Sequence, residues 1–348
     1  MIDAIRRLSP TTRLKLVILA AAVGVGIAVP YLFGSFVVGL ITLALIGGLF
    51  AMSIDLLGGY AGLITLGQAG ISAAAGYGVG YMADRVGAGH AAQILTGLAV
   101  GLVAAAVFGL MAMRSDGVYF IMITLAQGMI VWGLSIRLYR VTGAENGLTG
   151  IARPPAVALY WQYYWLVLAV VLVCSLLLYI AVRSPFGATM RGIRESESRM
   201  KMLGYNTSLQ KLYAFMLSGF FASIAGILLV YLLEFISPSA AYITASAIGV
   251  LQAILGGIGT LVGPMIGAFI IVFIQNVVSQ YLERWPTLMG LIFIGVILFA
   301  RKGIVGALSG AWHRWLRRGG GDGEGTGTVP ERTVDTVLGG ELEHSEPA

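Results

Sequence analysis

Long hydrophobic runs alternate with short polar segments along most of the chain. A helix needs about 20 apolar residues to cross the roughly 30 Å hydrocarbon core of a bilayer, and many of these runs are that long. The pattern predicts an all-α polytopic membrane protein with about ten transmembrane helices. The predicted spans are 14–33, 36–57, 66–83, 91–113, 118–136, 161–182, 212–234, 244–262, 264–282 and 286–300.

The segment from Ser184 to Lys211, called the charged loop below, breaks this pattern with a dense group of charged residues. Pro185 ends one helix and can begin the next, and Gly204 is suited to the left-handed conformation that closes a helix. The spacing predicts one amphipathic helix over 186–204. Its apolar positions are Phe186, Met190, Ile193, Met200 and Leu203, and the charged residues are Arg191, Arg194, Glu195, Glu197, Arg199, Lys201 and Lys211.

Two interpretations of this helix are open. It can lie on the lipid headgroups as an ordinary interfacial helix, or it can dock onto a soluble partner that drives the membrane protein. A multi-span protein that concentrates its internal charge in one loop offers such a partner a surface to bind.

Composition supports the membrane class. The chain has 348 residues, of which 58% are hydrophobic and only 11% are charged, and a soluble domain of this length carries far more charge. The mean hydropathy is +0.88. One cysteine and three isolated histidines exclude an internal disulfide framework and a metal site of ordinary spacing. The sequence contains no phosphate-binding glycine loop followed by lysine, so we expect no nucleotide hydrolysis, enzymatic activity or cofactor in this chain.

The distribution of basic residues predicts the orientation. With the N-terminus in the cytoplasm, the inner loops hold 17 of the 22 basic residues, as the positive-inside rule requires. Ten crossings then place both termini inside. The predicted organisation is a cytoplasmic segment 1–13, a transmembrane domain 14–300 that contains the charged loop, and a basic, then disordered, cytoplasmic tail 301–348.

Two glycine-rich segments interrupt the hydrophobic runs. The first glycine segment covers 58–70, and the second covers 256–267. Such paired interruptions in the two halves of a transporter point to the translocation site, because broken helices expose backbone groups to a substrate. The alternative is that both are tight turns where helices pack closely. The predicted pathway residues are Gly59, Gly62, Thr65, Gly67, Gln68, Gly256, Gly257 and Gly259.

Few polar residues lie inside the predicted spans. Asp55 is a functional candidate because an intramembrane carboxylate is costly, although a position near the end of its span lets it reach interfacial water. The glutamines at 68, 127, 252 and 275 are better explained as hydrogen bonds between helices than as ligands.

Several motifs, in order from about residue 37 to 305, resemble the branched-chain amino acid permeases of ATP-binding-cassette transporters, the LivM-type membrane subunit. The glycine signature 59–67 and the late motif 256–264 are similar to this family, and so is the outer-loop motif Thr142–Gly150. In the charged loop the similar residues are Ser184–Gly187, Ile193–Glu195, Leu203–Gly204 and Lys211–Phe215.

The resemblance implies the membrane half of an importer in the bacterial inner membrane. Its partners would be a second, LivH-type permease, two cytoplasmic ATPases that use ATP and Mg, and an extracytoplasmic solute-binding protein. The solute would be a branched-chain amino acid, or a related polar solute such as urea or an amide. The charged loop would carry the coupling residues Phe186, Gly187, Arg191, Arg194, Glu195 and Gly204.

The chain departs from the family pattern at four positions. Arg199 and Met200 stand where the family usually has alanine, Thr65 replaces a frequent serine, and Asp55 stands where asparagine is common. Two other classes stay open beside the importer. One is an ion-coupled secondary transporter that uses an intramembrane carboxylate such as Asp55, and the other is a channel-like or structural subunit. The charged loop argues against both, because neither needs a docking helix.

Overall fold

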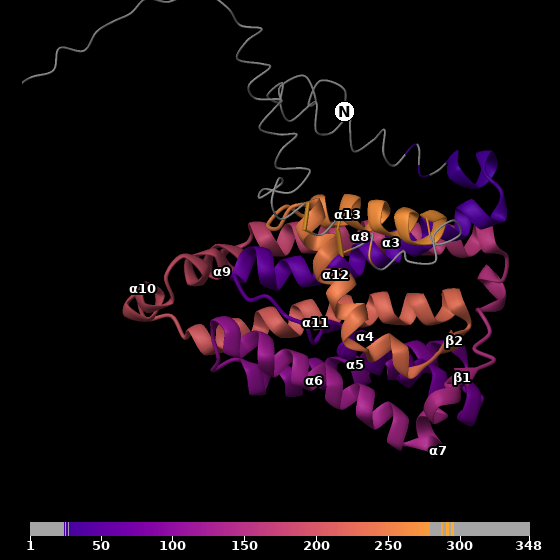
Figure 1. Ribbon diagram of the computed structural model, residues 1–348, viewed down its shortest axis with the longest axis horizontal. Helices are drawn as coiled ribbons and strands as arrows, with labels where there is room; N and C mark the ends of the chain where they lie inside the picture. Colours follow the sequence, from indigo (N-terminus) through magenta and orange to yellow (C-terminus); the bar gives the residue numbers. More distant parts are fainter. Residues whose placement is uncertain are drawn as a thin grey trace, which may run out of the picture. The chain divides into compact units, whose positions relative to one another are not determined.

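The computed structural model describes residues 24, 26, 28–278, 287, 290, 291, 294 and 295. The predicted spans 14–33 and 286–300 and the ranges 1–13 and 301–348 lie wholly or largely outside these residues. The described part is mainly helical, which confirms the all-α membrane class (Figure 1).

The helices and strands follow one another with short connections. In chain order they are α3 Ser35–Asp55, η1 Leu56–Ala61, α4 Gln68–Tyr81, η2 Met82–Val86, α5 His90–Ala112, α6 Gly117–Arg137, α7 Tyr139–Thr142, η3 Ala144–Asn146, β1 Leu148–Thr149, η4 Pro155–Val157, α8 Tyr160–Arg183, α9 Pro185–Glu195, α10 Glu197–Met202, α11 Thr207–Leu233, β2 Phe235–Ile236, η5 Pro238–Ala241, α12 Ile243–Gly256, α13 Gly263–Phe273 and η6 Ile274–Val278.

Five helical segments of the described part are long and apolar enough to cross a membrane. They are Ser35–Ala61, His90–Ala112, Gly117–Arg137, Tyr160–Arg183 and Thr207–Leu233. Two further apolar helices, Ile243–Gly256 and Gly263–Val277, are shorter. The predicted span 66–83 is also short: its helix α4 has 14 residues, which reach only about 21 Å.

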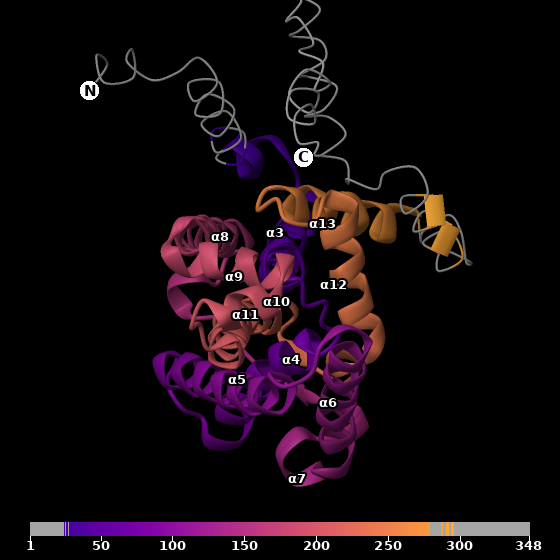
Figure 2. The same cartoon turned by 90° about the vertical axis from the view of Figure 1, so that its left-hand side faces the viewer.

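Helices α3, α4 and α11 form the centre of the described part. The most hydrophobic windows of the segments that begin at Ser35 and Thr207 are 67% and 61% buried, whereas those of the three other long segments are 22% to 33% buried. Helix α3 contacts α8, α11, α12 and α13, and α4 contacts α5, α6 and α11. Figure 2 shows α8, α5, α6 and α12 around these central helices.

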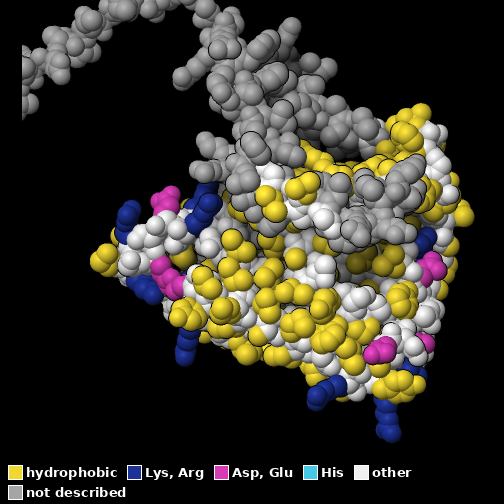
Figure 3. All heavy atoms as spheres, viewed as in Figure 1, with side chains coloured by type: hydrophobic (Ala, Val, Ile, Leu, Met, Phe, Trp, Pro, Cys, Tyr) yellow, Lys and Arg dark blue, Asp and Glu magenta, His cyan; other side chains and the backbone are white. Residues whose placement is uncertain are grey.

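The outer helices α5, α6 and α8 expose hydrophobic side chains. Large apolar residues on these helices are 53% to 63% exposed at positions that would face water in a soluble protein: Val103, Met122, Ile130, Val173 and Leu176. Hydrophobic side chains cover most of the middle of the face in Figure 3, and charged side chains lie toward its edges. This distribution fits a surface in contact with lipid.

Small residues let the central helices approach closely. A Cβ atom added to Gly97 of α5 would lie 2.8 Å from the carbonyl oxygen of Ala75 in α4. One added to Gly226 of α11 would meet the carbonyl oxygen of Ser72, also in α4. Glycine is therefore required where α4 packs between α5 and α11, as is common in membrane helices.

The two ends of the described part differ in structure. At one end, β1 pairs with β2 antiparallel, with Leu148 opposite Ile236, and α7 lies nearby. At the other end lie α9 and α10 of the charged loop (Figure 1). The loop 142–150 and the charged loop therefore lie at opposite ends, as the predicted topology requires.

The prediction of a single helix over 186–204 is wrong. The chain forms two helices, α9 and α10, with Ser196 between them in extended conformation at φ −163° and ψ 103°. The Ser196 side chain accepts a hydrogen bond from the backbone N–H of Arg199, as serine often does at the start of a helix. The apolar positions consequently do not share one face, since Met190 is buried and Leu203 is exposed.

Candidate functional site

The two glycine segments meet at the end of α3. Oδ1 of Asp55 accepts a hydrogen bond from the backbone N–H of Gly259, with 2.7 Å between the two atoms. A Cβ atom added to Gly59 would lie 2.5 Å from the nitrogen and 2.7 Å from the Cα of Gly259. Segments about 200 residues apart in sequence are thus in backbone contact, and a side chain at position 59 would separate them.

Helix α9 packs against the same place. The Arg194 guanidinium donates a hydrogen bond to the carbonyl oxygen of Gly59. Gly62 has a positive φ of 74°, and a Cβ added to it would lie 2.9 Å from Cγ of Arg194. These contacts therefore join α3, the second glycine segment and the charged loop. The four residues that make them are called the glycine junction below: Asp55, Gly59, Gly259 and Arg194.

Two further predicted pathway residues are buried at or just before the start of α4. Thr65 and Gln68 are both 0% exposed. Nε2 of Gln68 donates to Oγ of Ser218 in α11 at 2.9 Å, and Oγ1 of Thr65 accepts from the N–H of Gly67 at 3.2 Å. Their role in a pathway stays a prediction. A helix-to-helix role is confirmed for two of the glutamines, because Gln127 also donates to the carbonyl of Phe108 in α5.

The second glycine segment turns the chain sharply between α12 and α13. Gly257 has a φ of 120° and Gly259 a φ of 84°, both in the region that favours glycine. A Cβ on Gly256 would meet the carbonyl group of Gly263 across the turn. Both glycine segments thus interrupt helices, as the sequence predicts.

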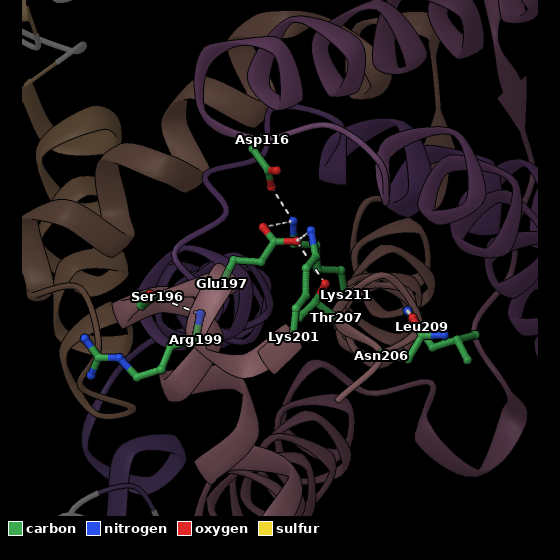
Figure 4. A network of polar contacts seen from close by, with 9 residues as sticks. All are labelled: Asp116, Ser196, Glu197, Arg199, Lys201, Asn206, Thr207, Leu209 and Lys211. Carbon is green, nitrogen blue, oxygen red and sulfur yellow. Dashed lines mark hydrogen bonds and ion pairs between the residues drawn. The ribbon is translucent and has the colours of Figure 1, made fainter. Parts of the chain in front are cut away.

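A buried ionic network fixes the start of α10 to the start of α11. Lys211 is 4% exposed, and its Nζ lies 2.7 Å from Oε2 of Glu197 and also contacts Oδ1 of Asp116 in the α5–α6 turn. Oε1 of Glu197 accepts a hydrogen bond from Oγ1 of Thr207 at 2.9 Å and pairs with Lys201. Figure 4 shows both lysines in contact with the carboxylate of Glu197.

The network also sets the charge state of Glu197. Burial by itself raises the pKa of this carboxyl. Hydrogen bonds from Lys211, Lys201 and Thr207 and the charge of Lys211 together outweigh that effect and lower the pKa to about 2. Glu197 is therefore ionised throughout the physiological range.

The predicted coupling residues lie in different environments. Phe186 is partly buried against the core, and a Cβ on Gly187 would meet the backbone of Val182. Nε of Arg191 donates to the carbonyl of Gly187 in its own helix at 3.3 Å. Glu195 is exposed and makes no hydrogen bond or ion pair with another described residue.

The end of α10 is an exposed apolar tip. Met202 is 81% exposed, Leu203 67% and Tyr205 46%. Gly204 has the predicted left-handed conformation, at φ 87°, and the backbone N–H of Tyr205 returns to the carbonyl of Met200 at 3.1 Å. Three exposed apolar side chains next to charged residues form a surface suited to contact with another protein.

A groove of about 510 Å³ lies at the opposite end, near β1 and β2. Trp132 and Tyr242 lie side by side in its wall, with ring centroids 5.5 Å apart, and Glu145 of the predicted outer loop contributes an acidic side chain. The other lining residues are Ile136, Ser237, Pro238, Ser239 and Thr244.

Sequence patterns did not identify Asp116, Glu197 and Lys211 as a network, nor Arg194 as a contact of Gly59. One clue was present. A lysine at the start of a strongly hydrophobic run is costly to bury unless it is paired, and Glu197 precedes it by 14 residues. Nothing local in the sequence identifies Asp116, which is 95 residues away.

The comparisons with known proteins agree with the predicted resemblance. The family described as "Branched-chain amino acid transport system / permease component" matches residues 36–301. The chain is 26% identical over 326 residues to the high-affinity branched-chain amino acid transport system permease protein LivM of Escherichia coli, covering 85% of this chain and 76% of that protein.

Two further relatives extend the comparison. LivM of Salmonella typhimurium is 25% identical over 323 residues, with 85% of this chain and 76% of the relative covered. The autoinducer 2 import system permease protein LsrC of Yersinia pestis is 29% identical over 231 residues, with 63% and 64% covered. No solved structure matches the chain significantly.

Proposed function

This chain belongs to the family of branched-chain amino acid transport system permease components, and we propose that it imports a branched-chain amino acid or a related small polar solute as the membrane subunit of an ATP-binding-cassette importer. The observation that carries the proposal is the pair formed by the exposed tip of α10 and the ion-paired base of the charged loop. A motor that pushes on a membrane protein needs a surface to bind and a rigid connection behind it.

The partners follow from this arrangement. The tip formed by Met202, Leu203 and Tyr205 docks into an apolar groove on one of two cytoplasmic ATPases, where ATP and Mg are used. A second, LivH-type permease completes the pathway, and an extracytoplasmic solute-binding protein delivers the solute. The charged loop then lies in the cytoplasm of a bacterial cell, with both termini on that side.

The groove beside Glu145 supports a delivery role for the opposite end. It combines an acidic side chain, an aromatic pair and hydroxyl groups, and it lies next to the loop 142–150. We place the binding protein over this groove. Alanine at Glu145 and Asn146 should weaken uptake when the binding protein is scarce and leave basal ATP hydrolysis unchanged.

The named relatives differ in the solute that their names give. Two of them are branched-chain amino acid permeases, and a third belongs to an autoinducer 2 import system. Coverage of this chain is larger for the amino acid permeases, at 85% against 63%, so the amino acid is the first solute to test. An ion-coupled transporter is disfavoured, since the relatives are permeases of transport or import systems.

Reconstitution tests the proposal. The chain, its second permease and the two ATPases are placed in vesicles, with the binding protein and labelled leucine outside. ATP inside should drive uptake, and ADP should not. A proton or sodium gradient that drives uptake by this chain without ATP would show that it is a secondary transporter instead.

Labelling of single cysteines tests the orientation. Ser198→Cys in α10 should react with an impermeant thiol reagent only from the cytoplasmic side, and Asn146→Cys only from outside. The one native cysteine, Cys174, is buried and gives little background. Reaction of Ser198→Cys in intact cells would overturn the proposed topology.

A further inference from the structure

We propose that Asp55 and Arg194 are positioning residues that hold the glycine junction closed, and that movement of α9 releases it during transport. The release of the junction during transport rests on the proposed function. The junction itself is a feature of the chain alone and can be tested without partners.

Asp55 is placed where a carboxylate is costly. It ends α3, is 1% exposed, and only Oδ1 has a hydrogen-bond partner, while Oδ2 has none among the described residues. A buried carboxylate with an unpaired oxygen is unfavourable, so packing alone gives no reason for an acid at this position. The hydrogen bond from the backbone N–H of Gly259 fixes the second glycine segment to α3.

Arg194 holds the other side of the same contact. It reaches from α9 to the carbonyl oxygen of Gly59, and its Nη1 lies 3.6 Å from the position of a Cβ on Gly259. Gly59 thus has its carbonyl held by the charged loop and its Cα against the second glycine segment. The guanidinium cannot leave without freeing Gly59, so a displacement of α9 loosens both glycine segments together.

A small apolar hollow borders the junction, and its accessibility reports whether the junction is closed. It measures about 10 Å³, enough for about one water molecule, and Asp55, Gly58, Ala253 and Ile258 contribute to its walls. Ala253 of α12 is 2% exposed. If the glycine segments separate, this hollow widens and Ala253 becomes accessible.

The experiment measures thiol labelling of Ala253→Cys in the purified full-length chain, with Cys174→Ala as background. Asp55→Ala and Arg194→Ala should each raise the labelling rate about tenfold, the change expected from losing one hydrogen bond to a charged group. Arg191→Ala is the matched control, because Arg191 lies on the same helix and its hydrogen bond within the described part goes to Gly187 of that helix. It should label like the parent.

A second variant at position 55 controls for misfolding. Asp55→Asn keeps an oxygen for the Gly259 N–H but loses the charge, so it should fold and label at an intermediate rate. Labelling of Arg194→Ala and Asp55→Asn at the rate of Arg191→Ala would overturn the proposal, whatever uptake experiments show.

The assembled complex separates positioning from docking. Arg194→Ala should retain its ATPases and hydrolyse ATP while uptake falls about tenfold, because the motor still binds but no longer controls the junction. Loss of co-purifying ATPase with unchanged labelling at position 253 would instead make Arg194 a docking residue and overturn the inference. The parent complex in the same vesicles tests the proposed function separately.

Discussion

The two helices of the charged loop are adjacent in sequence and opposite in environment. Helix α9 turns its apolar side chains inward, where Met190 is 1% exposed and Ile193 is 6% exposed. The end of α10 turns them outward, where Met202 is 81% exposed and Leu203 is 67% exposed. One helix is therefore packed into the described core, and the other leaves its apolar residues exposed, where the proposed function places a partner.

Each helix is tied to the membrane part by one charged residue. Arg194 of α9 bonds to Gly59 at the end of α3, and Glu197 of α10 bonds to Lys211 at the start of α11. Under the proposed function, docking and transmission are therefore separate properties of this loop. The four predictions below test that separation, from the largest expected effect to the smallest.

The largest effect is expected from Lys211→Ala. Removal of this buried lysine takes one hydrogen bond from Glu197 and one from Asp116, and each hydrogen bond to a charged group contributes about 1.5–3 kcal/mol. We expect a clear fall in the free energy of unfolding of the purified chain, measured by thermal or denaturant unfolding.

Lys201→Ala is the matched control for Lys211→Ala. Lys201 pairs with the same carboxylate, but its side chain is 59% exposed, and surface ion pairs contribute little. Equal losses of stability for the two variants would contradict the buried network as the anchor of α10.

The next effect is on docking. Met202→Asp and Leu203→Asp each remove an apolar side chain that a partner would bury, a loss of about 2 kcal/mol or more than tenfold in affinity. Binding of the ATPase to the purified permease measures it. Both residues are exposed, so the stability of the chain itself should not change.

Ser198→Asp adds the same charge elsewhere on α10 and controls for it. An ATPase affinity that falls equally for Ser198→Asp would show that charge, not the apolar tip, controls docking.

The third, smaller effect is a difference in stability and uptake between substitutions at two glycines with positive φ. Gly204→Ala introduces a side chain into open space, so it should cost only the backbone strain, about 1–2 kcal/mol. Gly62→Ala has the same strain at φ 74° and also meets Cγ of Arg194 at 2.9 Å. We expect Gly62→Ala to lower stability further and to reduce uptake, with ATPase binding intact.

If Gly204→Ala reduces uptake as strongly as Gly62→Ala, then α9 has no special role in transmission. Unfolding measurements and uptake on the same two variants decide this.

The smallest effect is a pH dependence. The pKa of Glu197 is lowered from 4.5 to about 2 in the folded chain, so the folded state binds this proton more weakly than the unfolded state. The resulting stabilisation is complete above about pH 4.5 and is lost as the pH falls toward 2. Unfolding of the parent and of Glu197→Gln, followed across this range, should differ most at neutral pH and converge in acid.

Glu195→Gln is the matched control, since Glu195 is exposed and unpaired among the described residues. It should follow the parent at every pH. A Glu197→Gln profile that runs parallel to the parent down to pH 2 would contradict the stabilising role of the network.

Much of the fold was predictable because hydrophobic length is a local property. The predicted spans 36–57 and 161–182 became the helical segments Ser35–Ala61 and Tyr160–Arg183. The span predicted to start at 212 begins earlier, at Thr207, because the Asn206 side chain caps the helix by accepting from the N–H of Leu209 at 3.1 Å. That difference places Lys211 inside a helix, where its charge must be paired.

The sequence by itself determined the membrane class, the glycine breaks and the position of the charged loop, since each depends on residues close together in the chain. Tertiary structure alone decided what those features contact. Asp55 meets Gly259 across 204 residues, and Arg194 meets Gly59 across 135. An apolar face has the same periodicity whether it packs inward, as in α9, or stays exposed, as at the end of α10, so only the packed chain distinguishes the two.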